Sequence, residues 1–579
     1  YIISEEERME TISISGNWRL SPYDKAECAL STPYFEEHAF LPYNNSNSIY
    51  TTLSSMTDEE ELEKLRKLKW VIEREFDFNH DESQRSVLLT HNALSAEING
   101  CIAEGTEITG LLKDGQNTIR LIVTSSFFSE VEILRSHDGV GYSAHLKAMK
   151  DGKLWHVTAY LDYEAFRRHE RLVRLSLLGQ STEKRITFEE KRSRYTIDIE
   201  IPEEKAELWC IHGDGKQIMY NALIEVGNAR LERRIAFRTI EVRNGALFVN
   251  GRETFVMGAV WPNMVTSDQK RYDIFLQSAA WANMNCLYIE DGHESHDFYN
   301  TCDRLGLIVL HNQEYEEFTF HPSFVSGEIK ADVFKAKVRE GDGYFGLCQD
   351  AIELERWTLK TRSDNANHGV IYSNLLSTVR EDGTWRPSHY AARRFFADLV
   401  PIMFIEDDKL MIYISNDGDK EEDVELSIKF MTYSGLKRNK RMYSAKVASH
   451  TAQKVQEIDL RQTDRKNEFV YIKLRTFKIH RELTLLLDEI SECAYEIPKI
   501  DTKLRMINPR SYSIRLSTNK PAFAVHLVME GTRGNFSDSF FEVRPEGEKS
   551  VIFSSEEDLE EEDVKERLKI FDLASSLKK

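Results

Sequence analysis

The middle of the chain alternates short apolar strands with helices, and this alternation constrains the fold more than any other feature. Strands are predicted at 254–260, 286–290, 306–310 and 369–372, and helices at 267–283, 294–305, 323–338, 344–359 and 387–396. Such an alternation is typical of a parallel α/β sheet. A closed eight-stranded α/β barrel takes about 250 residues, whereas this segment offers four strands in about 160. The sequence therefore predicts an incomplete barrel.

The segments on both sides of this alternation are rich in β-structure. Short runs of β-branched and aromatic residues, separated by turn residues, predict strands on the N-terminal side at 70–78, 86–89, 118–123 and 191–201. Similar runs on the C-terminal side lie at 410–415, 424–433, 512–517 and 522–529. Helices are predicted at 58–69 and in the acidic tail at 556–573. The expected fold class is therefore multidomain and β-rich, with one α/β part.

Length and charge exclude several kinds of protein. A chain of 579 residues is too long for one hydrophobic core, so three to five domains are expected. Lys and Arg number 76 and Asp and Glu 96, a net charge of −20 that argues against nucleic acid and anionic membranes as partners. No run of about 20 apolar residues could span a bilayer. The seven cysteines are scattered without a CxxC motif, so neither a disulfide framework nor a zinc site is expected.

Eight stretches of the chain resemble motifs of one enzyme family. Residues 298–306 read Phe-Tyr-Asn-Thr-Cys-Asp-Arg-Leu-Gly, and residues 389–396 read His-Tyr-Ala-Ala-Arg-Arg-Phe-Phe. Residues 535–541 read Asn-Phe-Ser-Asp-Ser-Phe-Phe. The other stretches lie at 14–20, 70–76, 96–100, 235–241 and 248–261. In this order, they resemble the β-mannosidases of glycoside hydrolase family 2.

The resemblance implies a domain order as well as an activity. It implies a jelly-roll domain at 1–163, an immunoglobulin-like sandwich at 164–240, a truncated (β/α) barrel at 241–398, a second immunoglobulin-like sandwich at 399–500 and a C-terminal β-sandwich with a helical tail at 501–579. The family reaction is the retaining hydrolysis of terminal β-mannosides. A lysosomal or secreted location is implied, with a cytoplasmic one as the alternative.

The catalytic motifs of the family are missing from this sequence. Retaining hydrolysis needs two carboxyl groups about 5 Å apart, and in the family these glutamates follow the fourth and seventh barrel strands. Here the chain passes from a segment like the third barrel helix to one like the helix before the eighth strand at 339–344. Four other site motifs, at 258–261, 289–293, 310–312 and 371–377, are also substituted. No counterpart of the sugar-site loop lies between Ser125 and Trp155. These substitutions favour loss of the ancestral activity.

Some polar and aromatic residues would still lie at the carboxyl ends of the strands, where barrels carry out catalysis. Glu290 and Glu314 are the candidates for a new catalytic carboxylate pair, although solvated loop charges are the favoured interpretation. The candidates for substrate binding are Trp261, Asp291, His311, Asn312, Tyr372 and Asn374. Trp261 could equally be a core plug at the barrel rim, and Tyr372 and Trp385 are more often core residues than ligands.

Neither a metal nor a cofactor is expected. His293, His296 and His311 could approach Glu290, but their spacing matches no metal-binding motif. A half barrel does leave two sheet edges and an apolar sheet face that something must cover. A flanking sandwich, the helix after residue 341 or another chain could do so. A protein partner or self-association over the open barrel is therefore expected. The resemblance implies a glycan with terminal mannose as a further candidate ligand.

Three hypotheses follow from the sequence. The first is a non-catalytic β-mannosidase homologue that acts by binding. The second is an active β-mannosidase whose catalytic segment is absent from the present sequence. The third is a hydrolase with altered chemistry that uses Glu290 and Glu314.

Overall fold

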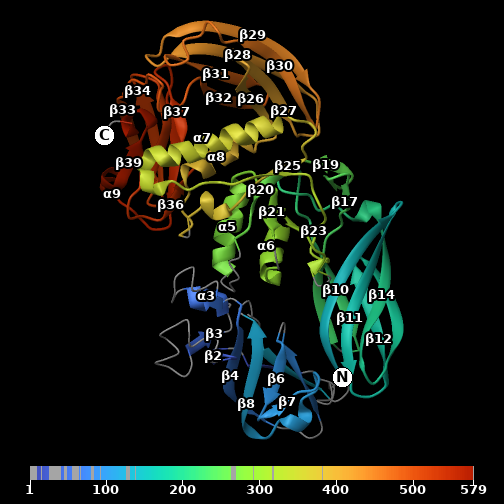
Figure 1. Cartoon of the computed structure of the whole chain (residues 1–579). Helices are drawn as coiled ribbons and strands as arrows, with labels where there is room; N and C mark the ends of the chain where they lie inside the picture. Colours follow the sequence, from blue (N-terminus) through green and yellow to red (C-terminus); the bar gives the residue numbers. More distant parts are fainter. Residues whose placement is uncertain are drawn as a thin grey trace.

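The structure is a computed structural model whose sheets pair into four β-sandwiches around a central α/β unit (Figure 1). None of the helices in the described part of the chain has the length and apolar character needed to cross a membrane. The described residues are 10–14, 16–24, 41–44, 49–54, 64–65, 67–79, 84–90, 93–124, 131–136, 139–227, 229–262, 269–290, 293–315, 318–380 and 382–577.

The first sandwich packs the sheet β3-β2-β4-β8-β6-β7 against the sheet β1-β9-β5. In β8 (Gly115–Thr124) alternate residues from Asn117 to Val123 are buried, as expected for a strand with one face on the core. The other elements are β1 (Glu10–Ser13), β2 (Asn17–Pro22), β3 (Leu41–Asn44), α3 (Ile49–Ser54), β4 (Lys69–Phe78), β5 (Arg85–Thr90), β6 (Ser95–Ile98), β7 (Cys101–Ile102), η2 (Thr109–Leu111) and β9 (Val131–Ser136).

The second sandwich packs β10-β11-β14 against β13-β12-β15-β16 around the buried Trp155 and Phe237. Strands β10 and β11 belong to this core, and the domain start expected at residue 164 stays a prediction. Its strands are β10 (Gly139–Asp151), β11 (Leu154–Ala165), β12 (His169–Leu177), β13 (Gln180–Phe188), β14 (Arg192–Pro202), β15 (Tyr220–Val226) and β16 (Ala229–Ile235).

The central unit holds one parallel sheet of six strands in the order β23-β22-β21-β20-β25-β24. Every residue of β20, β22 and β25 is buried, which is typical of a parallel sheet covered on both faces. The sheet does not close, so the prediction of an incomplete barrel is confirmed. The strands are β20 (Val256–Val260), β21 (Cys286–Ile289), β22 (Ile308–His311), β23 (Phe324–Ser326), β24 (Asp332–Phe334) and β25 (Gly369–Tyr372).

Four helices accompany this sheet: α5 (Gln269–Trp281), α6 (His296–Leu305), α7 (Gly343–Arg362) and α8 (Pro387–Phe395). Helix α6 shows how the sequence sets their ends. The Ser295 hydroxyl accepts a hydrogen bond from the Phe298 backbone N–H at its start, and Gly306 with φ +75° ends it. The apolar side of α6, which includes Phe298 and Cys302, packs into the same core as the outer face of the sheet.

The inner face of the sheet, which includes Val256, Cys286 and Ile308, is covered by the chain itself. It packs against Trp209, against Leu247 of the small antiparallel sheet β17 (Ile240–Arg243), β18 (Ala246–Val249) and β19 (Arg252–Thr254), and against the segment between β23 and β24. That segment, 327–331, joins the two sheet edges. Since each residue spans at most about 3.5 Å, the end of β23 and the start of β24 lie within about 20 Å of each other.

Two further sandwiches complete the chain, and α7 and α8 lie beside them (Figure 1, yellow, orange and red). The first has β26 (Leu399–Glu406), β27 (Lys409–Asn416), β28 (Glu422–Thr432), β29 (Lys437–Val447), β30 (Thr451–Asp459), β31 (Glu468–Arg475) and β32 (His480–Leu486). The second has β33 (Ile500–Asn508), β34 (Ser511–Thr518), β35 (Ala522–Met529), β36 (Gly534–Phe536), β37 (Phe541–Val543), β38 (Lys549–Ser555), α9 (Glu561–Arg567), β39 (Leu568–Phe571) and α10 (Leu573–Ser576).

The structure corrects two predictions of secondary structure. The helix predicted at 323–338 is wrong, because this stretch contains β23 and β24, which raise the strand count from four to six. The helical tail is interrupted by β39, which pairs with β35. The helix predicted at 58–69 lies largely outside the described residues, as do the first two residues of the helix predicted at 267–283.

Candidate functional site

The carboxyl ends of the six parallel strands meet at one edge of the central sheet, the edge at which open α/β sheets bind ligands. Trp261 follows β20, Glu290 follows β21 and Asn312 follows β22. The topology thus brings several of the sequence-predicted residues to one edge. Whether they form a site depends on where their side chains lie.

Trp261 is buried among the helices of the outer face. Its ring packs 4.8 Å, centroid to centroid, from the ring of Phe298, and its indole Nε1 donates to Oε1 of Glu294 over 2.9 Å. Only 2% of Trp261 is exposed. The indole is therefore part of the core at the rim of the sheet and is not an open surface on which a sugar ring could stack.

Glu294 is the residue of this edge that the sequence did not single out. It is 1% exposed, and besides Trp261 it accepts a hydrogen bond from the Tyr272 hydroxyl at Oε2 over 2.8 Å. A buried carboxylate that has no contact with water is stable only if it accepts hydrogen bonds from donors such as these. The only sequence signal for Glu294 is its place between two histidines, which fits no known spacing rule.

Glu290 and Glu314 are both exposed and follow the neighbouring strands β21 and β22. Among the described residues, neither has a hydrogen-bond or ion-pair partner. A retaining glycosidase instead holds two carboxyl groups about 5 Å apart, one as the acid and one as the nucleophile. In the described part of the chain, Glu290 and Glu314 have no neighbouring group that would fix them in such a geometry, and Asp291 lies outside the described residues.

The histidines bond to protein groups. His311 is buried, and its Nε2 lies 2.9 Å from the Tyr299 hydroxyl. His321 donates from Nδ1 to Oδ2 of Asp303 over 2.7 Å, and its Nε2 lies 3.1 Å from Nδ1 of His296. No group of three or more His, Cys, Asp or Glu side chains in the described part of the chain could hold a metal ion.

Tyr372 belongs to a buried hydrogen-bond chain. Its hydroxyl lies 3.0 Å from Oγ1 of Thr378, which is 3.2 Å from Nδ1 of His389. His389 in turn donates from Nε2 to the Ser278 carbonyl over 3.0 Å. Burial holds the pKa of His389 down to about 3, so the ring is neutral and its Nδ1 accepts from Thr378. This chain ties β25 to α8 and α5.

Two of the remaining predicted residues are exposed polar groups at this edge. Asn374 accepts a hydrogen bond at its side chain from the Leu376 N–H over 2.8 Å and so caps the short helix η6 (Leu375–Ser377). Asn312 is exposed directly after β22. Trp385 is buried and donates from Nε1 to the Ser278 hydroxyl over 2.9 Å.

Comparisons with known proteins point to one family. A family model for an Ig-fold domain, Ig_mannosidase, matches residues 496–576. Beta-mannosidase of the goat, Capra hircus, is 30% identical over 164 residues, which are 24% of this chain and 18% of the goat protein. Beta-mannosidase of Bos taurus is 32% identical over 151 residues, 22% of this chain and 16% of the bovine protein. The chain thus spans less than a fifth of the length of these curated relatives.

Solved structures show the same fold over nearly the whole chain. Beta-D-mannosidase from Dictyoglomus thermophilum has a TM-score of 0.79 at 14% identity, covering 97% of this chain and 99% of that one. The exo-chitosanase of Amycolatopsis orientalis has a TM-score of 0.73 at 11% identity, with the same coverage. At these identities the likeness concerns the fold alone.

Proposed function

Because the chain is a divergent homologue of the β-mannosidases of glycoside hydrolase family 2, we propose that it has kept their fold and lost their hydrolytic activity. In this proposal the protein acts by binding, and its ligand is a glycan with terminal mannose or a protein partner. The homology supplies the fold and the class of sugar, and the chemistry of the strand edge supports the loss of activity.

The observation that carries the proposal is the state of the carboxylates at the carboxyl edge of the sheet. Glycoside hydrolysis with retention needs one carboxyl to protonate the leaving oxygen and a second, about 5 Å away, to attack the anomeric carbon. Glu290 and Glu314 are exposed, and Glu294 is buried behind Trp261 and already accepts two hydrogen bonds. Carboxylates in these positions contact water or pack in the core. They do not form an acid and a nucleophile that face one sugar.

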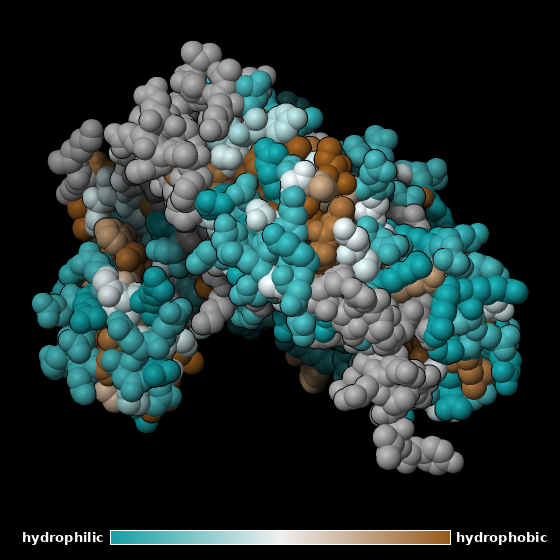
Figure 2. All heavy atoms as spheres, turned by 90° about the horizontal axis from the view of Figure 1, so that it is seen from below, coloured by the Kyte–Doolittle hydropathy of each residue, from teal (hydrophilic) through white to brown (hydrophobic). Residues whose placement is uncertain are grey.

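What covers the inner face of the central sheet bears on whether a protein partner is needed. The inner sheet face packs against other parts of this chain. On the face seen from below, hydrophilic residues make up most of the surface that is coloured by hydropathy, with apolar residues in patches between them (Figure 2). A partner over the open barrel is therefore not needed to bury the sheet, which makes a glycan the better-supported ligand of the two.

The test is the turnover of a chromogenic β-mannoside by the purified chain of 67.3 kDa, verified by intact mass. We expect no turnover above the blank between about pH 4 and pH 8, the range in which carboxyl pairs work. Clear turnover that Glu290→Gln or Glu314→Gln abolishes would overturn the proposal. Turnover by a native protein of larger mass, with none from this chain, would favour an active β-mannosidase whose catalytic segment is absent here.

The binding part of the proposal has its own measurement. Calorimetric titration of the same chain with a β-1,4-linked mannobiose should show saturable binding, and the β-glucose disaccharide cellobiose is the matched control. Equal binding of both sugars, or of neither, would contradict a role in recognising terminal mannose.

A further inference from the structure

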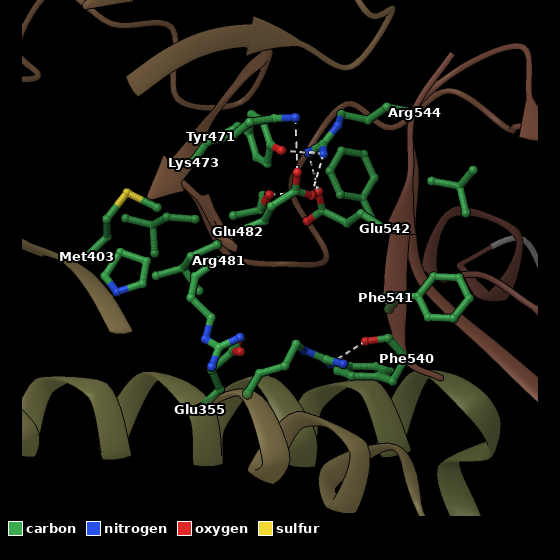
Figure 3. A pocket seen from close by; sticks show the side chains of 18 of the residues that line it. Glu355, Met403, Tyr471, Lys473, Arg481, Glu482, Phe540, Phe541, Glu542 and Arg544 are labelled. Atoms are coloured by element: carbon green, nitrogen blue, oxygen red, sulfur yellow. Dashed lines mark hydrogen bonds and ion pairs between the residues drawn. The ribbon is translucent and has the colours of Figure 1, made fainter. Parts of the chain in front are cut away.

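A cavity of about 770 Å³ lies where the central unit meets the two C-terminal sandwiches. Its walls come from α7 and α8, from β26, β28, β31 and β32, and from the segment around β37 (Figure 3). This size is within the range of small-molecule sites. Most residues that line this cavity are far in sequence from the strand-edge residues, and a site here is independent of the proposed function.

One wall of the cavity is the sheet β29-β28-β31-β32. Lys429 pairs with Tyr471, and Tyr471 pairs with Thr484 on the next strand. Lys473 stands two residues from Tyr471 on β31, so both side chains leave the same face of the sheet, and Lys473 pairs with Glu482. The register therefore gathers two lysines and one glutamate around the Tyr471 ring.

The facing wall adds an arginine and a second glutamate. The guanidinium carbon of Arg544, just after β37, lies 3.5 Å from the ring centroid of Tyr471, and Arg544 also hydrogen-bonds the Tyr471 hydroxyl. Its Nη2 donates to Oε2 of Glu482 over 2.7 Å, and its Nη1 lies 3.5 Å from Oε2 of Glu542. The same oxygen of Glu542 accepts from the Thr484 hydroxyl over 2.7 Å. Figure 3 shows this cluster at one end of the cavity.

Lys429 completes a set of three cations on one aromatic ring. Its Nζ lies 5.8 Å from the Tyr471 centroid, and Nζ of Lys473 lies 5.6 Å from it. In the described part of the chain Lys429 forms no ion pair, whereas Lys473 pairs with Glu482 over 3.0 Å. Burial first, and then the neighbouring Lys473 and Lys437, lower the pKa of Lys429, while the charge of Glu546 acts in the opposite direction.

Two carboxylates face these cations. Burial raises the pKa of Glu542 to about 7, against the effect of Arg544, so this group is about half ionised at neutral pH. For Glu482 burial also acts upward, but the hydrogen bond from Tyr471 and the charge of Arg544 bring its pKa to about 2. Lys429, Lys473 and Arg544 therefore share the carboxylates of Glu482 and Glu542, and the charge of Glu546 also acts on Lys429. Lys429 has no ion pair among the described residues, and an anion beside it would supply one.

Apolar side chains line the cavity on two sides away from this cluster, Met403 of β26 on one side and Phe540 and Phe541 on the other, with Arg481 and Glu355 between them (Figure 3). A ligand that suits the cluster and these apolar walls carries an anionic group on a compact amphiphilic body. Polar contacts fix the orientation of such a ligand, and the apolar wall contributes the area.

We propose that this cavity is a binding site for a small organic anion, a carboxylate or phosphate ester, whose anionic group contacts Lys429, Lys473 and Arg544. The oxyanion is the chemistry that the two ligand classes share. Guanidinium and ammonium groups bind both through charge-assisted hydrogen bonds.

The experiment is calorimetric titration of the full chain at neutral pH with phenyl phosphate, benzoate, inorganic phosphate and the neutral benzyl alcohol, each to about 10 mM. Phenyl phosphate or benzoate should bind at least tenfold more tightly than benzyl alcohol. The stronger of the two identifies the anionic group, and inorganic phosphate alone should bind more weakly than phenyl phosphate if the apolar wall contributes. Failure of both organic anions to bind more tightly than benzyl alcohol overturns the proposal.

Substitutions locate the site. Lys429→Met keeps the apolar stem and removes the charge, and should weaken binding of the better anion about tenfold or more, since a charge-assisted hydrogen bond contributes about 1.5–3 kcal/mol. Lys446→Met is the matched control, because Lys446 is an exposed lysine of β29 paired with Glu421 and Asp423. Equal affinities of the two variants overturn the assignment. Should Lys429→Met fail to fold, Lys473→Met replaces it, with the same expected loss and the same contradicting result.

Discussion

The indole Nε1 of Trp261 donates to Oε1 of Glu294 over 2.9 Å, and both side chains are buried at the rim of the open sheet. Trp261 is a residue that the sequence marked as a candidate for sugar binding, and Glu294 is a carboxylate that it did not mark. Their hydrogen bond, with the second one from Tyr272, accounts for both acceptor oxygens of Glu294. The pair thus stabilises the rim, and this role has a consequence for stability that can be measured.

Replacing Glu294 by alanine should destabilise the fold by about 2–5 kcal/mol, because two buried donors, on Trp261 and Tyr272, lose their acceptor. Glu294→Gln keeps one acceptor oxygen and should lower the free energy of unfolding by less. Urea unfolding followed by tryptophan fluorescence measures the effect. Glu290→Ala, at the exposed position after β21, is the control and should leave the midpoint unchanged. Equal losses in Glu294→Ala and Glu290→Ala would contradict the structural role.

A second prediction concerns the joint between α7 and the sandwich that begins with β26. The Arg362 guanidinium is buried, and its Nη2 donates to the Ala397 carbonyl over 3.1 Å and to Oδ2 of Asp417 over 2.6 Å. Arg362→Met removes these bonds and leaves Asp417 without its cation. The free energy of unfolding should fall by about 3–5 kcal/mol, as it does when one partner of a buried ion pair is removed.

The control for Arg362 is Arg461, which pairs with Asp459 at the surface. Exposed ion pairs contribute little to stability, so Arg461→Met should leave the unfolding midpoint where it is. Thermal unfolding of both variants beside the unchanged chain gives the comparison. A midpoint for Arg362→Met that equals that of Arg461→Met would show that the joint does not depend on this side chain.

A third prediction follows from the close approach of two parallel strands. A Cβ on Gly258 of β20 would lie 2.0 Å from the carbonyl oxygen of Cys286 on β21, a backbone atom that cannot move aside without breaking the pairing. Gly258→Ala should therefore lower the soluble yield and the melting temperature sharply. Gly105→Ala, where the added Cβ would meet nothing within 4 Å, is the control. A folded Gly258→Ala with an unchanged melting temperature would refute the strand register.

Prediction from the sequence succeeded where the signal is local. The apolar run at 254–260 and the Gly-ended helix before Gly306 both lie where they were expected, as β20 and α6. The helix predicted at 323–338 is wrong, because β23 and β24 lie there. In the structure the N–H and hydroxyl of Ser323 both donate to Oδ1 of Asp303, over 3.0 and 2.6 Å, so this serine anchors an edge strand instead. That partner is 20 residues away, and no local pattern contains it.

The candidate sites show the same limit. The strand ends could be placed from the sequence, because parallel strands share one carboxyl edge. The burial of Trp261 behind α5 and α6 could not be predicted from the sequence, because it depends on how the helices pack. The cavity cluster had no sequence signal at all: Tyr471 and Arg544 come from different sandwiches and are 73 residues apart. Only the tertiary pairing brings such charges together.

The last prediction is a pH dependence of stability that Glu542 causes. Its carboxyl faces Arg544 after β37, Thr484 and Glu482 of β32 and, from α7, Glu355. Burial raises its folded-state pKa from 4.5 to about 7. The folded chain therefore binds the proton more tightly than the unfolded chain. This contribution is fully present below about pH 4.5 and is lost as the pH rises to about 7.

Glu542→Gln removes this titration. The free energy of unfolding of the variant, relative to the unchanged chain, should therefore rise by about 3 kcal/mol between pH 4.5 and pH 8, whatever the offset at low pH. Denaturant unfolding of both proteins at matched ionic strength measures the difference. Glu546→Gln, an exposed glutamate of the same segment, is the control and should follow the unchanged chain. A difference between Glu542→Gln and the unchanged chain that stays constant with pH would mean that Glu542 is ionised throughout, and the charge balance argued for the cavity would then be wrong.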